Sequence, residues 1–190
     1  MDVNIFDVMI IARKISLTRL IELVTGRREP PPGQVIPADK TQKWDVAVLV
    51  PDCGVTECRF TKTLQASADD DKKRSNILVM LFELFRAIQH PDYKKNLLED
   101  SSITVKVAHT FKHGGHMHNV MELKYGNKDR IYFYANTGKK APEKNVLFLL
   151  MAHHKKDNTT PDEVKNPCTK EIKRILDAKG IVDFCKEDFK

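Results

Sequence analysis

The sequence predicts an α+β protein in which a small antiparallel sheet packs with helices. Three strand-like runs follow one another, "NVMELKY", "RIYFYAN" and "VLFLLMAHH". Turns that contain Gly126-Asn127 and Gly138 separate them, which indicates an antiparallel meander. Ahead of the meander, "SNILVMLFELFRAIQH" predicts an apolar helix that Ser75 caps and Pro91 ends. Strands and helices that occur in separate runs are typical of this class.

The remaining strands are predicted from their own patterns. "WDVAVLV" (44–50) and "ITVKVAHTF" (103–111) alternate between apolar and polar residues and are rich in β-branched side chains. The last run of the meander, 146–154, is continuously apolar, as expected of a central strand that is buried on both faces. "VTECRF", after the turn "PDCG", is either a returning strand or the lead-in to the helices.

The N-terminal region is expected to be a helical extension. Residues 4–25 carry apolar side chains at helical spacing, and Gly26 follows as a C-cap. The next segment, "REPPPGQVIPADKTQK", has the composition of a linker or an irregular arm. We therefore expect an N-terminal helix and proline-rich arm over 1–43 and one domain over 44–190.

A further helix is predicted near the C-terminus. In "TPDE" (160–163), Thr160 can cap the helix, Pro161 can take its first position, and Glu163 can close a capping box. This helix is expected to end near Gly180.

The excess positive charge is concentrated in one stretch. The chain has a net charge of +6, and residues 101–165 hold eleven lysines and arginines against six acidic residues, together with six of the seven histidines. A concentrated basic region suggests a polyanionic partner such as nucleic acid, and the alternative is a solvated basic face.

The composition also bears on location. No apolar run approaches the roughly 20 residues that cross a bilayer, and Asp2 and Asp7 stand where a secretory signal would carry positive charge. The four cysteines show no C-x-x-C pair and no regular spacing. We therefore expect a cytoplasmic protein with reduced thiols and no membrane association.

Residues 44–165 resemble the RelE/HigB/ParE superfamily of bacterial and phage toxins, particularly its HigB-like, phage-derived branch. "RIYFYAN" looks like the family's Arg-containing aromatic strand, and "VLFLLMAHHKKDNTTPDEV" resembles its apolar central strand, Lys-Lys pair and Thr-Pro helix start. "NVMELKY" is similar to the family's Glu-Leu-Arg strand, with Lys124 in place of the arginine. "WDVAVLVPDCGVTECRF" resembles the first strand and the lead-in to the helices.

The resemblance implies an endoribonuclease that cuts mRNA, possibly on the ribosome, and that a cognate antitoxin neutralises. Such enzymes use no metal and no cofactor, because the RNA 2′-hydroxyl attacks its own phosphodiester. Two alternatives remain open: a non-catalytic RNA- or ribosome-binding protein on the same fold, and a ParE-like toxin that acts on a protein target such as gyrase.

Candidate catalytic residues lie on two strands of the meander. The two-residue period of "RIYFYAN" places Arg130, Tyr132 and Tyr134 on one face. Arg130 is expected to stabilise a phosphorane, since a guanidinium matches two phosphate oxygens, and Tyr134 to orient the base or the phosphate. A strand with an exposed arginine and half-buried tyrosines is the alternative. Lys124 offers a point charge where the family has a guanidinium, so activity is in doubt.

The tetrad "HHKK" leaves the end of the predicted central strand. His154 is expected to be the acid or base, Lys155 to neutralise the phosphate, and His153 and Lys156 to contact RNA. We expect Arg130 and this tetrad to act as one unit, and a solvated strand end is the alternative.

The segment "FKHGGHMH" (111–118) has three interpretations. The spacing of its three histidines matches no structural zinc pattern, and no metal is predicted. By the resemblance, Lys112 and His113 would be RNA contacts beside the groove. Otherwise it is a mobile, solvated loop, in which Gly114-Gly115 permit positive φ angles.

Overall fold

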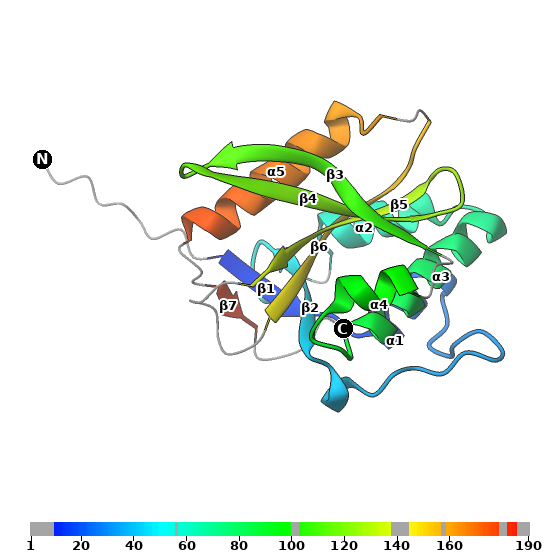
Figure 1. The fold of residues 1–190 in the computed structure, drawn as a ribbon. Helices are drawn as coiled ribbons and strands as arrows, with labels where there is room; N and C mark the ends of the chain where they lie inside the picture. Colours follow the sequence, from blue (N-terminus) through cyan, green and yellow to red (C-terminus); the bar gives the residue numbers. More distant parts are fainter. Residues whose placement is uncertain are drawn as a thin grey trace, which may run out of the picture.

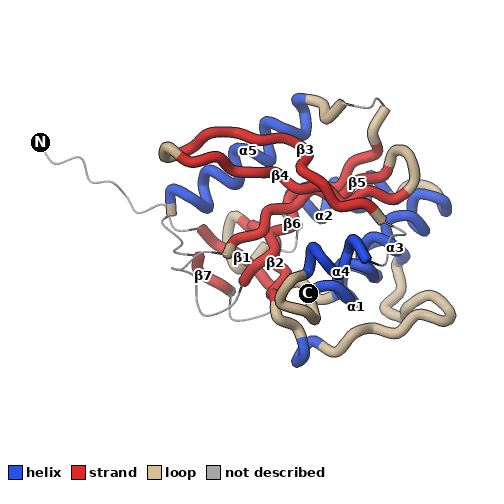
Figure 2. Tube along the Cα trace, viewed as in Figure 1, coloured by secondary structure: helices blue, strands red, loops and turns tan. Residues whose placement is uncertain are grey.

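A computed structural model describes residues 10–55, 57–99, 103–137, 145–156, 159–178 and 182–185. These residues form a seven-stranded sheet with helices on both faces (Figure 1, Figure 2). The strands, in the order of the sheet, are β3 (Thr104–His113), β4 (His116–Tyr125), β5 (Asp129–Asn136), β6 (Asn145–His154), β2 (Trp44–Val50), β1 (Ile10–Lys14) and β7 (Val182–Phe184). The helices are α1 (Leu17–Thr25), α2 (Arg59–Ser67), α3 (Asp71–Ala87), α4 (Tyr93–Glu99) and α5 (Asp162–Asp177), with a 3₁₀ turn at Asp39–Thr41.

The predicted antiparallel meander is confirmed. Strands β3, β4, β5 and β6 pair in succession, each antiparallel to the next. β6 lies inside the sheet between β5 and β2, and Val146 to Leu150 are all buried, as its continuous apolar run predicts. β2 pairs with β6 in parallel and with β1 antiparallel.

An apolar core packs against each face of the sheet. α1 to α4 pack on one face in a core that includes Phe82, Phe85, Ile131 and Phe133. Of the described helices, only α5 packs on the other face, where its apolar residues meet Tyr132, Phe148 and Leu150, among others. Figure 1 shows α5 running alongside the β3–β4 hairpin, away from α1, α3 and α4. The α+β class is thus confirmed for the described residues.

The helix predicted over 4–25 is wrong for Ile10–Lys14, which form β1, antiparallel to β2. The helix α1 begins only after Ser16, whose side chain accepts a hydrogen bond from the Arg19 N–H at 3.2 Å. A short apolar run fits a buried strand as well as a helix. Here the run forms a strand because it pairs with the edge of β2. Gly26 caps α1 as predicted, with a φ of 74°. Residues 4–9 lie outside the described residues.

Part of the segment expected as an arm therefore belongs to the sheet and the core. Leu20 and Ile21 of α1 have no exposed surface and pack in the same apolar core as β2 and α3. This core includes residues from both sides of position 43. The expected division of the chain into 1–43 and 44–190 remains a prediction.

Two further expectations need correction, and one that was left open is now decided. α3 starts at Asp71, because the Asp70 side chain accepts a hydrogen bond from the Lys73 N–H at 2.8 Å and caps the helix one turn before Ser75. "VTECRF" leads into α2, since Arg59 and Phe60 are already helical. Thr160 does not cap α5: Pro161 is the N-cap, and the Thr160 hydroxyl accepts a hydrogen bond from Lys155 Nζ at 3.2 Å. Gly138 and Gly180 lie outside the described residues.

The expectation of reduced thiols is wrong for two of the four cysteines. Cys53, in the loop after β2, and Cys185, at the end of β7, form a disulfide whose Cα atoms are 5.5 Å apart. Cys58 and Cys168 are free and buried. The sequence spacing gave no sign of the pair, because 132 positions separate its members and only the sheet brings them together. Within the described segments, no helix is long and apolar enough to cross a membrane.

We expect the disulfide to stabilise the fold. The Cys185→Ser change should lower the free energy of unfolding by about 2–4 kcal/mol, because the unfolded chain regains the freedom that the cross-link removes. Urea unfolding with and without dithiothreitol measures this loss. The reductant should shift the parent protein's midpoint but leave that of the Cys185→Ser variant in place. An equal shift in both would contradict the pairing.

Candidate functional site

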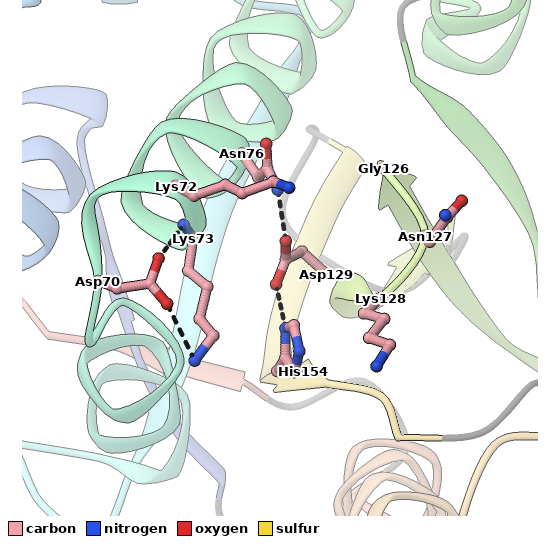
Figure 3. A pocket seen from close by; sticks show the side chains of 9 residues that line it. All are labelled: Asp70, Lys72, Lys73, Asn76, Gly126, Asn127, Lys128, Asp129 and His154. Carbon is pink, nitrogen blue, oxygen red and sulfur yellow. Dashed lines mark hydrogen bonds and ion pairs between the residues drawn. The ribbon is translucent and has the colours of Figure 1, made fainter.

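A pocket of about 720 Å³ lies between the N-terminal turns of α3 and the turn that joins β4 to β5. Figure 3 shows the side chains that line it. They come from α3 and its cap, from the β4–β5 turn with the first residue of β5, and from the last residue of β6: Asp70, Lys72, Lys73, Asn76, Gly126, Asn127, Lys128, Asp129 and His154.

A chain of hydrogen bonds orients His154 in this pocket. Its Nδ1 lies 2.7 Å from Oδ1 of Asp129, and the Asn76 side-chain amide donates to Oδ2 of the same carboxylate at 2.6 Å. Asp129 is 4% exposed, whereas the His154 side chain is 35% exposed. An imidazole that donates from Nδ1 to a carboxylate keeps the lone pair of Nε2 free to take a proton. His154 can therefore act as a base, and once protonated as an acid.

Three lysines line the same pocket as this imidazole. Lys72 and Lys128 are exposed and form no ion pair with any described residue. Lys73 pairs with Asp69 at 2.7 Å and with Asp70 at 3.2 Å, and these contacts raise its pKa. The first turn of α3 adds the positive end of its dipole. The pocket thus combines a titratable imidazole with cationic groups that suit a phosphate.

Local sequence explains how these groups meet. Because Asp70 caps α3, both Lys72 and Asn76 are helical. They are four positions apart and therefore lie on the same face of the helix. Asp129 stands directly across from His154 in the β5–β6 register, so their side chains project from the same face of the sheet. Gly126 allows the tight turn before them, with a φ of 62° that a residue with a side chain rarely adopts.

Arg130 is not in this pocket, and the expected exposed strand arginine is wrong. It is 5% exposed, and its guanidinium donates to the backbone carbonyls of Asp129 and Asn127, both at 2.8 Å. In the β5–β6 register it stands across from His153, on the α5 face of the sheet. Both ends of the guanidinium fork are thus occupied by the protein itself.

Lys155 is buried on the same side as Arg130. It is 3% exposed, and its Nζ donates to Oε2 of Glu122 and to the Thr160 hydroxyl, both at 3.2 Å. Glu122 has no exposed surface, and its Oε1 lies at ion-pair distance from Arg130 Nε, 3.4 Å, and from Lys106 Nζ, 3.3 Å. Burial lowers the pKa of Lys155, and Glu122 opposes that shift.

The structure splits the expected unit of Arg130 and the "HHKK" tetrad. His154 reaches the α3 face of the sheet, whereas His153 lies on the α5 face, 3.7 Å from a Glu163 carboxylate oxygen. Lys156 is exposed beyond the end of β6. Lys124 stands across from Arg130 on β4 and is half-buried.

Tyr134 is half-buried against the α5 cluster, and burial raises the pKa of its hydroxyl. It lies four positions along β5 from Arg130 and does not line the pocket. The predicted faces of β5 are confirmed: Ile131 and Phe133 pack in the core under α3, and Tyr132 packs under α5.

The segment "FKHGGHMH" forms the tip of the β3–β4 hairpin. His113 and His116 face each other across Gly114 and Gly115, whose φ angles of 53° and 82° suit a two-residue hairpin turn. His113 Nε2 lies 2.5 Å from an Asp177 carboxylate oxygen at the end of α5, and Lys112 is exposed. The whole of β4 separates this tip from the β4–β5 turn, about 30 Å at the rise of a strand. Lys112 and His113 are therefore far from the pocket.

The same hairpin carries a histidine that should make stability depend on pH. His109 Nε2 lies 2.8 Å from the Thr169 hydroxyl of α5, and burial, with a smaller contribution from Lys165, lowers the pKa of His109 below its usual 6.5. As the pH falls through 6.5, the unfolded chain takes up a proton that the folded state resists, so this part of the stability is lost.

We therefore expect less stability in mild acid. Urea unfolding should give a lower free energy at pH 5.5 than at pH 7.5, and His109→Gln, which keeps a partner for Thr169, should reduce the difference. Loss of stability on raising the pH through this range would contradict the assignment.

Among the described residues, no group of three or more histidine, cysteine or acidic side chains is arranged to hold a metal ion. From the sequence we named His154 as a candidate but did not name the residues that share its pocket, among them Asp129, Asn76 and Lys128. The predicted hairpin turn "GNKD" contains a lysine and an acidic residue, which is a weak indication of a functional site. Nothing in the sequence of α3 indicated that Asn76 would reach across to β5.

No protein-family model matches this chain, and no curated protein and no solved structure matches it either.

Proposed function

We propose that this chain is a metal-independent endoribonuclease that uses His154 to activate the RNA 2′-hydroxyl. The observation that carries the proposal is the bond between Asp129 and His154, at 2.7 Å, inside a pocket lined by Lys72, Lys73 and Lys128. A carboxylate-oriented imidazole beside cationic groups matches the two needs of phosphodiester cleavage, a base for the nucleophile and positive charge at the phosphorane.

The reaction follows from these positions. Nε2 of His154 takes the proton of the 2′-hydroxyl, and the 2′-oxygen attacks the adjacent phosphorus. The bond from phosphorus to the 5′-oxygen breaks, and that oxygen receives a proton from the imidazolium or from Lys128. The products are a 2′,3′-cyclic phosphate and a 5′-hydroxyl. The lysines stabilise the extra charge that the phosphorane carries in the transition state.

The resemblance to the RelE/HigB/ParE toxins supports mRNA as the substrate and a protein antitoxin as the partner. The α+β arrangement of residues 44–165, with α2, α3 and α4 between β2 and the meander, is compatible with it. The burial of Arg130 and Lys155 favours a second candidate, an RNA- or ribosome-binding protein that does not cut, because neither cation can reach a phosphate in the pocket.

Product analysis tests the proposal. Purified protein is incubated with a labelled mRNA in EDTA, with and without ribosomes, beside the same RNA with 2′-O-methyl groups. We expect cleavage of the unmodified RNA alone, with 2′,3′-cyclic phosphate ends and the same rate with and without the chelator. Binding of both RNAs without cleavage would favour the second candidate. Activity lost in EDTA and restored by zinc would overturn the metal-independent mechanism.

A further inference from the structure

A buried set of charges lies behind the pocket, on the opposite face of the sheet. Glu122, Arg130 and Lys155 are each 5% exposed or less and face α5, whereas His154 and Asn76 reach the pocket on the α3 side. The backbone of residues 127–129 runs between the two. The buried set, which we call the brace, can influence the pocket through this backbone and through the peptide link between Lys155 and His154.

The brace holds three successive carbonyl groups of the pocket wall. Arg130 Nη2 donates to the carbonyl of Asn127 and Nη1 to that of Asp129, both at 2.8 Å. The backbone N–H of Lys155 donates to the carbonyl between them, that of Lys128, also at 2.8 Å. The side chains of these same three residues line the pocket.

One carboxylate orients both cations of the brace. Glu122 lies 3.4 Å from Arg130 Nε and 3.2 Å from Lys155 Nζ. A planar guanidinium can direct its two terminal nitrogens at two carbonyls at once, which a lysine cannot do. Buried ion pairs are costly, and apolar residues of similar size often stabilise a fold as well. Stability alone therefore does not explain charges at these positions.

We propose that Arg130 and Lys155 are positioning residues that hold the Asp129–His154 pair and Lys128 in their working geometry. The part of this proposal that concerns catalysis rests on the proposed function. The part that concerns the position of the pocket wall rests on the hydrogen bonds alone. The two bonds of the Asp129 carboxylate, at 2.7 and 2.6 Å, depend on where the backbone places residue 129.

The test compares Arg130→Lys with the parent protein and with Ile175→Ala. The lysine variant keeps a charge beside Glu122 but loses the two-carbonyl fork. Ile175 is 2% exposed on α5, so its truncation destabilises the fold without touching residues 127–129. Each protein is measured for amide exchange at Lys155, for the ¹⁵N shifts of the His154 ring, and for kcat and KM on RNA.

In Arg130→Lys we expect faster exchange of the Lys155 amide and loss of the signature of a proton fixed on Nδ1 of His154. A displaced catalytic pair should lower kcat by about tenfold to a hundredfold with little change in KM. Ile175→Ala should keep the parent values in all three measurements. Should Arg130→Lys fail to fold, Lys155→Met, which removes only the buried ammonium, should change the same measurements in the same direction.

Parent exchange and parent ¹⁵N shifts in a folded Arg130→Lys protein would overturn the brace, whatever its kcat. The same changes in Ile175→Ala would overturn it too, because they would report general loosening. If no protein in the set cuts RNA, the proposed function fails, but the exchange and the nitrogen shifts still decide whether the brace holds the pocket wall.

Discussion

Replacing His154 with Gln should lower the rate of RNA cleavage by about a hundredfold to ten-thousandfold, because general acid–base catalysis contributes on this scale. Among the side chains that line the pocket, the imidazole is the one suited to general acid–base catalysis. Glutamine can still donate to Asp129, and the His154 side chain is 35% exposed, so the fold should be intact. Single-turnover cleavage of a short labelled RNA measures the rate, and circular dichroism checks the fold.

His153→Gln is the matched control. The two histidines are neighbours, but the sheet separates them: His153 faces α5 and pairs with Glu163, whereas His154 faces the pocket. The His153→Gln protein should cut RNA at a rate close to that of the parent. The reverse result, with His153 essential and His154 dispensable, would refute the pocket as the active site.

The second large effect concerns stability. Glu122→Gln should lower the free energy of unfolding by about 3–5 kcal/mol, because it leaves the buried cations without their counter-charge. Arg130 and Lys155 are 5% and 3% exposed, so water cannot replace the lost carboxylate. Urea unfolding followed by circular dichroism gives the free energies of both proteins.

Glu57→Gln is the control for this change. Glu57 pairs with Lys62 at 3.3 Å, but both side chains are more than 60% exposed. An exposed pair contributes little, because water and salt screen it. The control should therefore unfold at the parent midpoint. If both variants unfold at that midpoint, the buried cations do not depend on Glu122 for their counter-charge.

The sequence by itself predicted the elements for which several local signals agree. The continuous apolar run of β6 indicated an internal strand, and the turn residues before β5 indicated a meander, so both were predictable. The two faces of β5 were predictable as well, since side chains alternate along any strand. His154 was a candidate because an imidazole stood at the end of a predicted buried strand, and its functional role stays a prediction.

The tertiary structure alone decided which strands pair and which side chains lie opposite each other. β1 was predicted as a helix because its apolar residues fit both periods, and only the edge of β2 settles the choice. Arginine is a residue type common at surfaces and in active sites. Here α5 covers the face of the sheet on which Arg130 lies, and its guanidinium donates hydrogen bonds to turn carbonyls. Asp129 joins His154 because the β5–β6 register sets them opposite each other, and Asn76 joins them because α3 packs on that face. Such contacts depend on register and packing between distant segments, which local patterns do not encode.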